Sequence, residues 1–98
     1  MRIDVIYVRP LGDYRQFETR LLDVVQTFGA DVHFASSHSG DLGRFERERV
    51  FVSTRLPNVV IVRDGEVVGQ TIGDLPKREL ELLVQRAIDC AHVVRTAA

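Results

Sequence analysis

The stretch that decides the fold of this chain reads Leu56-Pro57-Asn58-Val59-Val60-Ile61-Val62-Arg63-Asp64-Gly65-Glu66, followed by residues 67–72. Asp64-Gly65 lies between two runs rich in β-branched residues, which is the strongest short-range signal of a β-hairpin. We therefore predict two antiparallel strands, over residues 58–63 and 66–71, with Pro57 at the head of the first strand.

A strand, a helix and a second strand are predicted before this hairpin. Residues 2–8 are apolar on both faces, as in an inner strand of a covered sheet. Asp13 is expected to cap the helix that follows, with Gln16 as its capping-box partner, and Gly29 to end it. The apolar stripe of this helix consists of Tyr14, Phe17, Leu21, Val24, Val25 and Phe28. Residues 30–36 are predicted to form a strand parallel to the first, because a whole helix connects the two.

Two further helices complete the predicted order. Residues 42–52 are ambiguous: charged residues around Phe45 favour a short helix to about Phe51, whereas Val50-Phe51-Val52 also fits an extended strand. A final amphipathic helix begins near Pro76 and has a stripe of Leu80, Leu83, Val84, Ala87, Ala91 and Val94. We therefore predict an α/β fold of order β-α-β-α-β-β-α with a four-stranded mixed sheet, in one domain spanning residues 1–98.

Composition and charge exclude several functional classes. The 98 residues are 45% hydrophobic and 28% charged, with a net charge of −1, as in an ordinary globular protein. General nucleic-acid and anionic-membrane binders need a clustered excess of positive charge, so neither partner is expected. There is no run of about 18 apolar residues and no signal-peptide pattern, so we expect a cytoplasmic protein.

Leu56-Pro57, Asp64-Gly65-Glu66 and Gly73 carry a resemblance to the thioredoxin-like superfamily that extends over residues 2 to about 92. The resemblance implies the minimal thioredoxin-like core and a cis Leu56–Pro57 peptide bond. The redox motif of the family falls on residues 12–15, which contain no cysteine, and its buried acid falls on Ile6. Thiol chemistry needs a thiolate at the start of that helix, so we expect a redox-inactive member.

The remaining candidates for thiol or metal chemistry are weak. Cys90 is the sole cysteine, which excludes an internal disulfide and a multi-cysteine zinc site; we interpret it as a buried structural thiol. Asp31, His33 and His38 could be drawn as a metal site, but nothing in their spacing supports one. We expect no metal, no cofactor and no catalytic residue.

The resemblance also implies a function. Thioredoxins hold extended peptides at the residue before the family proline, here Leu56, by backbone hydrogen bonds that need no cysteine. The implied groove consists of Pro10, Gly12, Asp13, Tyr14, Arg15, Thr54, Arg55, Leu56, Pro57, Asn58 and Gly73. We expect a non-catalytic module that binds an unknown protein or extended peptide, as a chaperone or assembly factor.

Known redox-inactive relatives of this kind support the same interpretation. Thioredoxin-like proteins of hydrogenase maturation lack the dithiol, and residues 72–75 are similar to a segment of KaiB-like clock proteins, which act by binding partners. The chain itself is expected to be a monomer or a weak homodimer through the hairpin edge, residues 67–71.

Two alternatives stay open. Arg9, Arg15 and Arg55 could converge near the free N–H groups at the start of the first helix and bind an anion, or they are scattered surface arginines. Tyr7 resembles the thiolate-stabilising tyrosine of glutathione transferases, which suggests a glutathione-binding protein or a related enzyme. That family's acidic residue-serine pair is absent from residues 71–74, so a non-catalytic role is favoured without excluding an enzyme.

Overall fold

The computed structural model describes residues 1–38 and 55–89. Within them lie the strands β1 (Ile3–Arg9), β2 (Val32–His38), β3 (Asn58–Arg63) and β4 (Glu66–Ile72), and the helices α1 (Arg15–Thr27) and α3 (Lys77–Asp89). The predicted strands and the first helix are confirmed, and the last helix is confirmed as far as Asp89; its predicted stripe residues Ala91 and Val94 lie outside the described residues. The helix predicted over residues 42–51, Thr54 and Cys90 lie outside the described residues.

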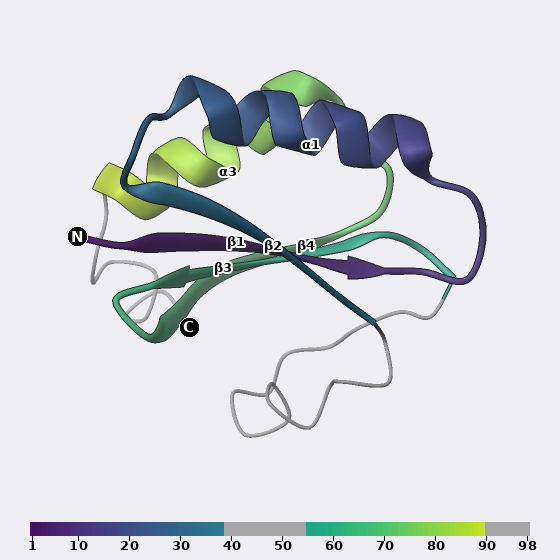
Figure 1. Cartoon of the computed structure of the whole chain (residues 1–98), viewed down its shortest axis with the longest axis horizontal. Helices are drawn as coiled ribbons and strands as arrows, with labels where there is room; N and C mark the ends of the chain where they lie inside the picture. The colour runs from purple at the N-terminus through teal and green to yellow at the C-terminus, as the bar shows by residue number, and fades with distance from the viewer. Residues whose placement is uncertain (39–54, 90–98) are drawn as a thin grey trace.

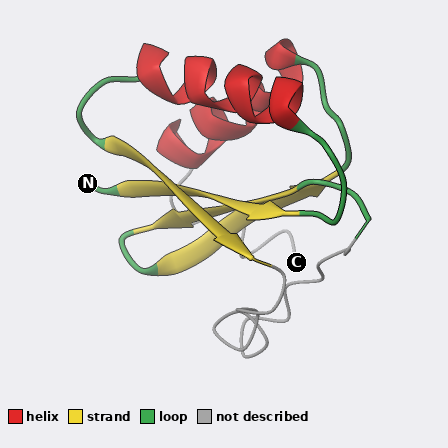
Figure 2. Ribbon diagram, turned by 45° about the vertical axis from the view of Figure 1, so that its right-hand side comes forward, coloured by secondary structure: helices red, strands yellow, loops and turns green. Residues whose placement is uncertain are grey.

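The strands form one mixed sheet in the order β2-β1-β3-β4. β2 runs parallel to β1, whereas β3 is antiparallel to both β1 and β4. Both described helices lie on the same face of this sheet, as Figures 1 and 2 show. The predicted α/β class and four-stranded sheet are therefore confirmed. Neither described helix is long and apolar enough to cross a membrane.

β1 and β3 are buried on both faces, as their continuous apolar runs predict. On the helix side, alternate strand residues meet the apolar stripes of α1 and α3 in a core that includes Ile3, Val5, Tyr7, Phe17, Leu21, Val59, Ile61, Leu80 and Val84. The opposite face has a second buried cluster, made of Ile6, Val8, Val60 and Val62. Side chains alternate across a strand, so these two sets occupy opposite faces.

β2 begins at Val32, two residues later than predicted. Gly29 follows α1 with a φ of 85°, in the left-handed region that favours glycine. The Val32 N–H then donates to the Gly29 carbonyl at 3.3 Å, and the Ile3 N–H donates to the Asp31 carbonyl at 2.9 Å. Residues 30 and 31 therefore belong to the turn that brings the chain back to β1.

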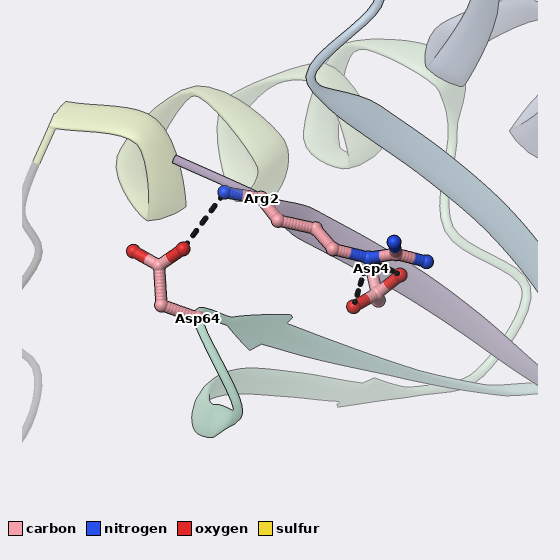
Figure 3. A network of polar contacts seen from close by, with 3 residues as sticks. All are labelled: Arg2, Asp4 and Asp64. Atoms are coloured by element: carbon pink, nitrogen blue, oxygen red, sulfur yellow. Dashed lines mark hydrogen bonds and ion pairs between the residues drawn. The ribbon is translucent and has the colours of Figure 1, made fainter.

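The hairpin turn is confirmed at Asp64 and Gly65. Their φ angles are 48° and 87°, as a two-residue type I′ turn requires. Asp64 also fixes the hairpin to the start of β1: its Oδ1 accepts the Arg2 N–H at 2.8 Å, and its own N–H donates to the Arg2 carbonyl at 2.9 Å. Figure 3 shows this contact and the ion pair of Arg2 with Asp4.

Candidate functional site

Strand pairing brings most of the predicted groove residues to one end of the sheet. Val8 lies opposite Asn58, and Asn58 lies opposite Ile72. The loop 10–14 after β1, residues 55–57 before β3, and Gly73 after β4 therefore share this end, which is also where α1 begins (Figure 1). Thr54 is the one predicted groove residue outside the described ranges.

The expected cis Leu56–Pro57 bond is wrong. No peptide bond among the described residues is cis, and both Leu56 and Pro57 are described. Trans is the default for an X–Pro bond, by about 0.5–1 kcal/mol, and the family resemblance was the sole argument for the exception. The Pro57 carbonyl accepts the Gly73 N–H at 2.8 Å, and the Leu56 carbonyl accepts the Asn58 side-chain amide at 2.8 Å.

A hollow of about 180 Å³ lies where β1 passes into α1; it is lined by Tyr7, Arg9, Pro10, Gly12, Asp13, Tyr14, Arg15 and Glu18. A second hollow of about 290 Å³ shares part of this lining and continues to the β4–α3 loop, with Gln16, Phe17 and Asp74. Five of the predicted groove residues, Pro10 and Gly12 to Arg15, therefore line one or both hollows.

Asp13 and Arg15 pair with each other at the start of α1. The Arg15 Nε donates to Asp13 Oδ1 and Nη2 donates to Oδ2, both at 3.0 Å. These bonds lower the pKa of the Asp13 carboxyl and raise that of Arg15. The expectation that Asp13 is the cap residue is corrected: Tyr14 holds the cap position without a side-chain bond, and Asp13 accepts the Arg15 N–H at 3.2 Å. Because the carboxylate occupies this end, an incoming anion is opposed.

Two of the three arginines line the first hollow, and the third does not. Arg9 and Arg15 line the first hollow, where Asp13 already pairs with Arg15. Arg55 is exposed beside Leu56 and does not line that hollow within the described part of the chain. This arrangement gives no support to the anion-binding alternative.

Tyr7 is buried at the floor of the first hollow. It is 2% exposed, and its ring packs against Phe17 with the centroids 5.6 Å apart. Burial, followed by the negative charge of Glu18, raises the pKa of its hydroxyl above the ordinary value of 10.0. A tyrosine that stabilises a thiolate benefits from positive surroundings. Arg9 supplies some positive charge, but burial and the negative charges of Glu18 and Asp74 outweigh it, so the pKa of Tyr7 is raised. The glutathione alternative is not favoured.

Arg20 supports the site, and the sequence analysis missed it. Its Nη1 donates to Asp74 Oδ1 and to the Leu75 carbonyl, both at 2.7 Å, and its guanidinium lies 6.0 Å from the centre of the Phe17 ring. The side chain thereby ties the loop after β4 to α1. No sequence signal identifies it, because the contact depends on where the loop returns in space.

Leu11 is the second residue that sequence analysis missed. Its side chain is 74% exposed, and that of Leu56 is 42% exposed. Leu11 lies three residues beyond Val8, and Leu56 lies two residues before Asn58, the partner of Val8. Two large apolar side chains therefore stand in solvent at the same end of the sheet as the hollows.

Of the three residues considered for a metal site, Asp31 and His33 are described with their side chains, whereas the side chain of His38 lies outside the described part of the structure. His33 is exposed on β2. Within residues 1–38 and 55–89, no three His, Cys, Asp or Glu side chains are grouped so as to hold a metal ion.

Comparison with known proteins identifies the fold. No family model and no curated protein matches the chain. Among solved structures, it is similar to reduced desulfothioredoxin from Desulfovibrio vulgaris Hildenborough, with a TM-score of 0.65 and 23% identity over 87% of this chain and 81% of that one. This chain has a thioredoxin-like fold. A malarial protein is similar as well, with a TM-score of 0.66 and 10% identity over 88% of this chain and 97% of the other.

The thioredoxin-like fold is what the resemblance of Leu56-Pro57, Asp64-Gly65-Glu66 and Gly73 implied. At these identities the likeness concerns the fold. What the thioredoxin-like scaffold does in this chain must be argued from its own residues.

Proposed function

We propose that this thioredoxin-like chain binds an extended segment of a protein partner at the end of the sheet where β1 stops and β3 starts, and does not catalyse thiol chemistry. The observation that carries the proposal is the exposure of Leu11 and Leu56 at the end of the sheet where the hollows at the start of α1 also lie. Exposed apolar patches are typical of interaction sites, whereas a single exposed leucine is common on any surface, so what distinguishes Leu11 and Leu56 is that both lie at one end of the sheet.

The two leucines act as anchors. Fully burying an exposed leucine side chain is worth about 1.5–3 kcal/mol. Leu11 is 74% exposed and Leu56 is 42% exposed, so the two gain only part of that range and support a weak, reversible complex. The Leu56 carbonyl already accepts the Asn58 amide, and the Leu56–Pro57 bond is trans. The Leu56 carbonyl has a second lone pair, so backbone hydrogen bonds to a peptide at Leu56 can accompany the side-chain contacts.

The proposal includes no thiol chemistry because of the residues at the start of α1. A thiolate held at a helix N-terminus is the nucleophile of the thioredoxin reaction. Residues 12–15 of this chain are Gly, Asp, Tyr and Arg. A role as a chaperone or assembly factor fits a surface that binds without reacting.

Paired variants test the anchors. Peptides are first selected from a random display library on the wild-type chain, and their affinities are measured by fluorescence polarisation. The double variant Leu11→Asp, Leu56→Asp should weaken binding at least about tenfold, since each tenfold loss corresponds to about 1.4 kcal/mol of lost contact. Leu82→Asp is the matched control, because Leu82 is 40% exposed on α3. Equal affinities in all three proteins would refute the proposal.

A further inference from the structure

The first hollow has a buried hydroxyl at its floor, on Tyr7. This residue is 2% exposed, and it nevertheless lines the hollow of about 180 Å³ where β1 passes into α1. Its hydroxyl makes no hydrogen bond to another described residue. A buried tyrosine hydroxyl normally has a hydrogen-bond partner, because leaving it unpaired costs free energy. The hydroxyl of Tyr7 is therefore available to a polar group that enters the hollow.

The carboxylate of Glu18 borders the same hollow. Glu18 lies in the first turn of α1 and is half-buried. It has no ion pair in the part of the chain that the structure describes. The other acid of this hollow differs, because Asp13 is bonded twice to Arg15. A carboxylate and a hydroxyl that can both accept a hydrogen bond therefore border one small space.

The charges around the hollow favour a cation over an anion. Burial raises the pKa of Tyr7 most, and the negative charge of Glu18 raises it next. Arg9 lowers that pKa without cancelling the rise. A cation that enters would gain an ion pair with Glu18 at a partly buried place, where charges attract more strongly than in water. Tyr14 also lines the hollow, and aromatic rings attract cations as well.

We propose that the first hollow takes a lysine side chain of the bound segment, whose ammonium group donates hydrogen bonds to the Glu18 carboxylate and to the Tyr7 hydroxyl oxygen. This inference rests on the function proposed above and names the chemistry of its partner. Lysine fits better than arginine, because a compact ammonium has three donors that can reach two separate acceptors. A planar guanidinium is matched best by one carboxylate in bidentate contact.

Peptide and protein variants are combined to test this lysine site. Peptides selected on the wild-type chain are made again with each lysine replaced by norleucine, which keeps the carbon stem and lacks the ammonium. In the wild type, one such replacement should weaken binding at least about tenfold, because a charge-assisted hydrogen bond is lost. In Glu18→Gln the same replacement should cost about threefold or less, since only neutral acceptors remain. Tyr7→Phe should give an intermediate loss, because the carboxylate remains.

Glu81→Gln is the matched control. Glu81 is also a half-buried glutamate on a helix, and it lines a different hollow, together with Phe28. This substitution removes the same charge from the protein, so the full effect of the lysine should be kept. Binding of the norleucine peptide to each variant shows that the variant folds.

The outcomes separate the lysine site from the proposed function. Peptides that bind through Leu11 and Leu56 but contain no lysine would overturn the lysine site alone. A lysine effect that is equal in the wild type and Glu18→Gln, or that is lost in Glu81→Gln, would do the same. If binding does not depend on the two leucines, the proposed function fails and the lysine site fails with it. Arginine in place of the lysine should bind more weakly, and equally tight binding would overturn the choice of an ammonium group.

Discussion

Tyr7 is buried against Phe17, and its environment favours the neutral phenol over the phenolate. Burial and the charge of Glu18 raise its pKa, so the folded chain holds the phenolic proton more tightly than the unfolded chain. As the pH rises above about 10, the unfolded state ionises first, and the free energy of unfolding falls until the pH passes the raised pKa of the folded state. Tyr7→Phe should lack this part of the decline.

Urea unfolding of both proteins between neutral pH and the highest pH at which they fold measures the difference. The other ionisable groups are common to the two chains, so their effects cancel. Parallel stability curves across the whole range would show that the Tyr7 proton is not held more tightly by the folded chain.

Arg20 makes a residue-scale prediction about how the site is held. Its side chain is 29% exposed and bonds Asp74 and the Leu75 carbonyl. Arg20→Lys should cost about 1–2 kcal/mol of stability. The lysine ammonium is tetrahedral and on a shorter side chain, so it does not reproduce both hydrogen bonds of the planar guanidinium. Arg86→Lys, on the exposed side of α3, is the control and should change stability by less than about 0.5 kcal/mol. The free energies of unfolding of both variants are measured by denaturant titration. Equal losses of stability in Arg20→Lys and Arg86→Lys would count against the bridging role of Arg20.

At the scale of elements, the β3–β4 hairpin should depend on Gly65. Its φ of 87° lies in the left-handed region, although a Cβ there would meet no atom within 4 Å. Gly65→Ala should therefore cost about 1–2 kcal/mol through backbone strain alone, and Gly65→Asn should cost less, because asparagine tolerates this region better. Thermal unfolding of the wild type and the two variants gives the order of their stabilities. An alanine variant as stable as the wild type would contradict the strained turn.

The elements also show which parts of the fold could be predicted. The α1 stripe around Phe17 and Leu21, and the Asp64-Gly65 turn, are local signals that tertiary packing reinforces, so their predictions are confirmed. The start of β2 depends on the turn after Gly29, and the cap position of Tyr14 on how Asp13 pairs with Arg15. Both are decided by a few hydrogen bonds that neighbouring residue types do not specify.

At the scale of the whole molecule, the sequence could place the candidate site at one end of the sheet because strand order determines which loops meet. It could not identify Leu11, because the exposure of a side chain depends on the folded chain around it. It could not identify Arg20 either, because the Arg20–Asp74 contact joins residues that are 54 apart in the sequence. The trans Leu56–Pro57 bond shows the opposite weakness: a family resemblance carries over backbone details that this chain does not share. The sequence pattern therefore predicts the fold, but it predicts only some of the residues that make up the candidate site.

The most direct test of the proposed function is an amide NMR titration of the labelled chain, first with a pool of extended peptides and then with reduced glutathione. We expect peptides to shift the amides of residues 11–15, 55, 56, 58 and 73, and glutathione to shift none of them. No response to peptides, or shifts confined to other surfaces, would contradict a binding site at this end of the sheet. Shifts of the same residues with glutathione would contradict a site that takes only peptides and would favour the glutathione-binding alternative.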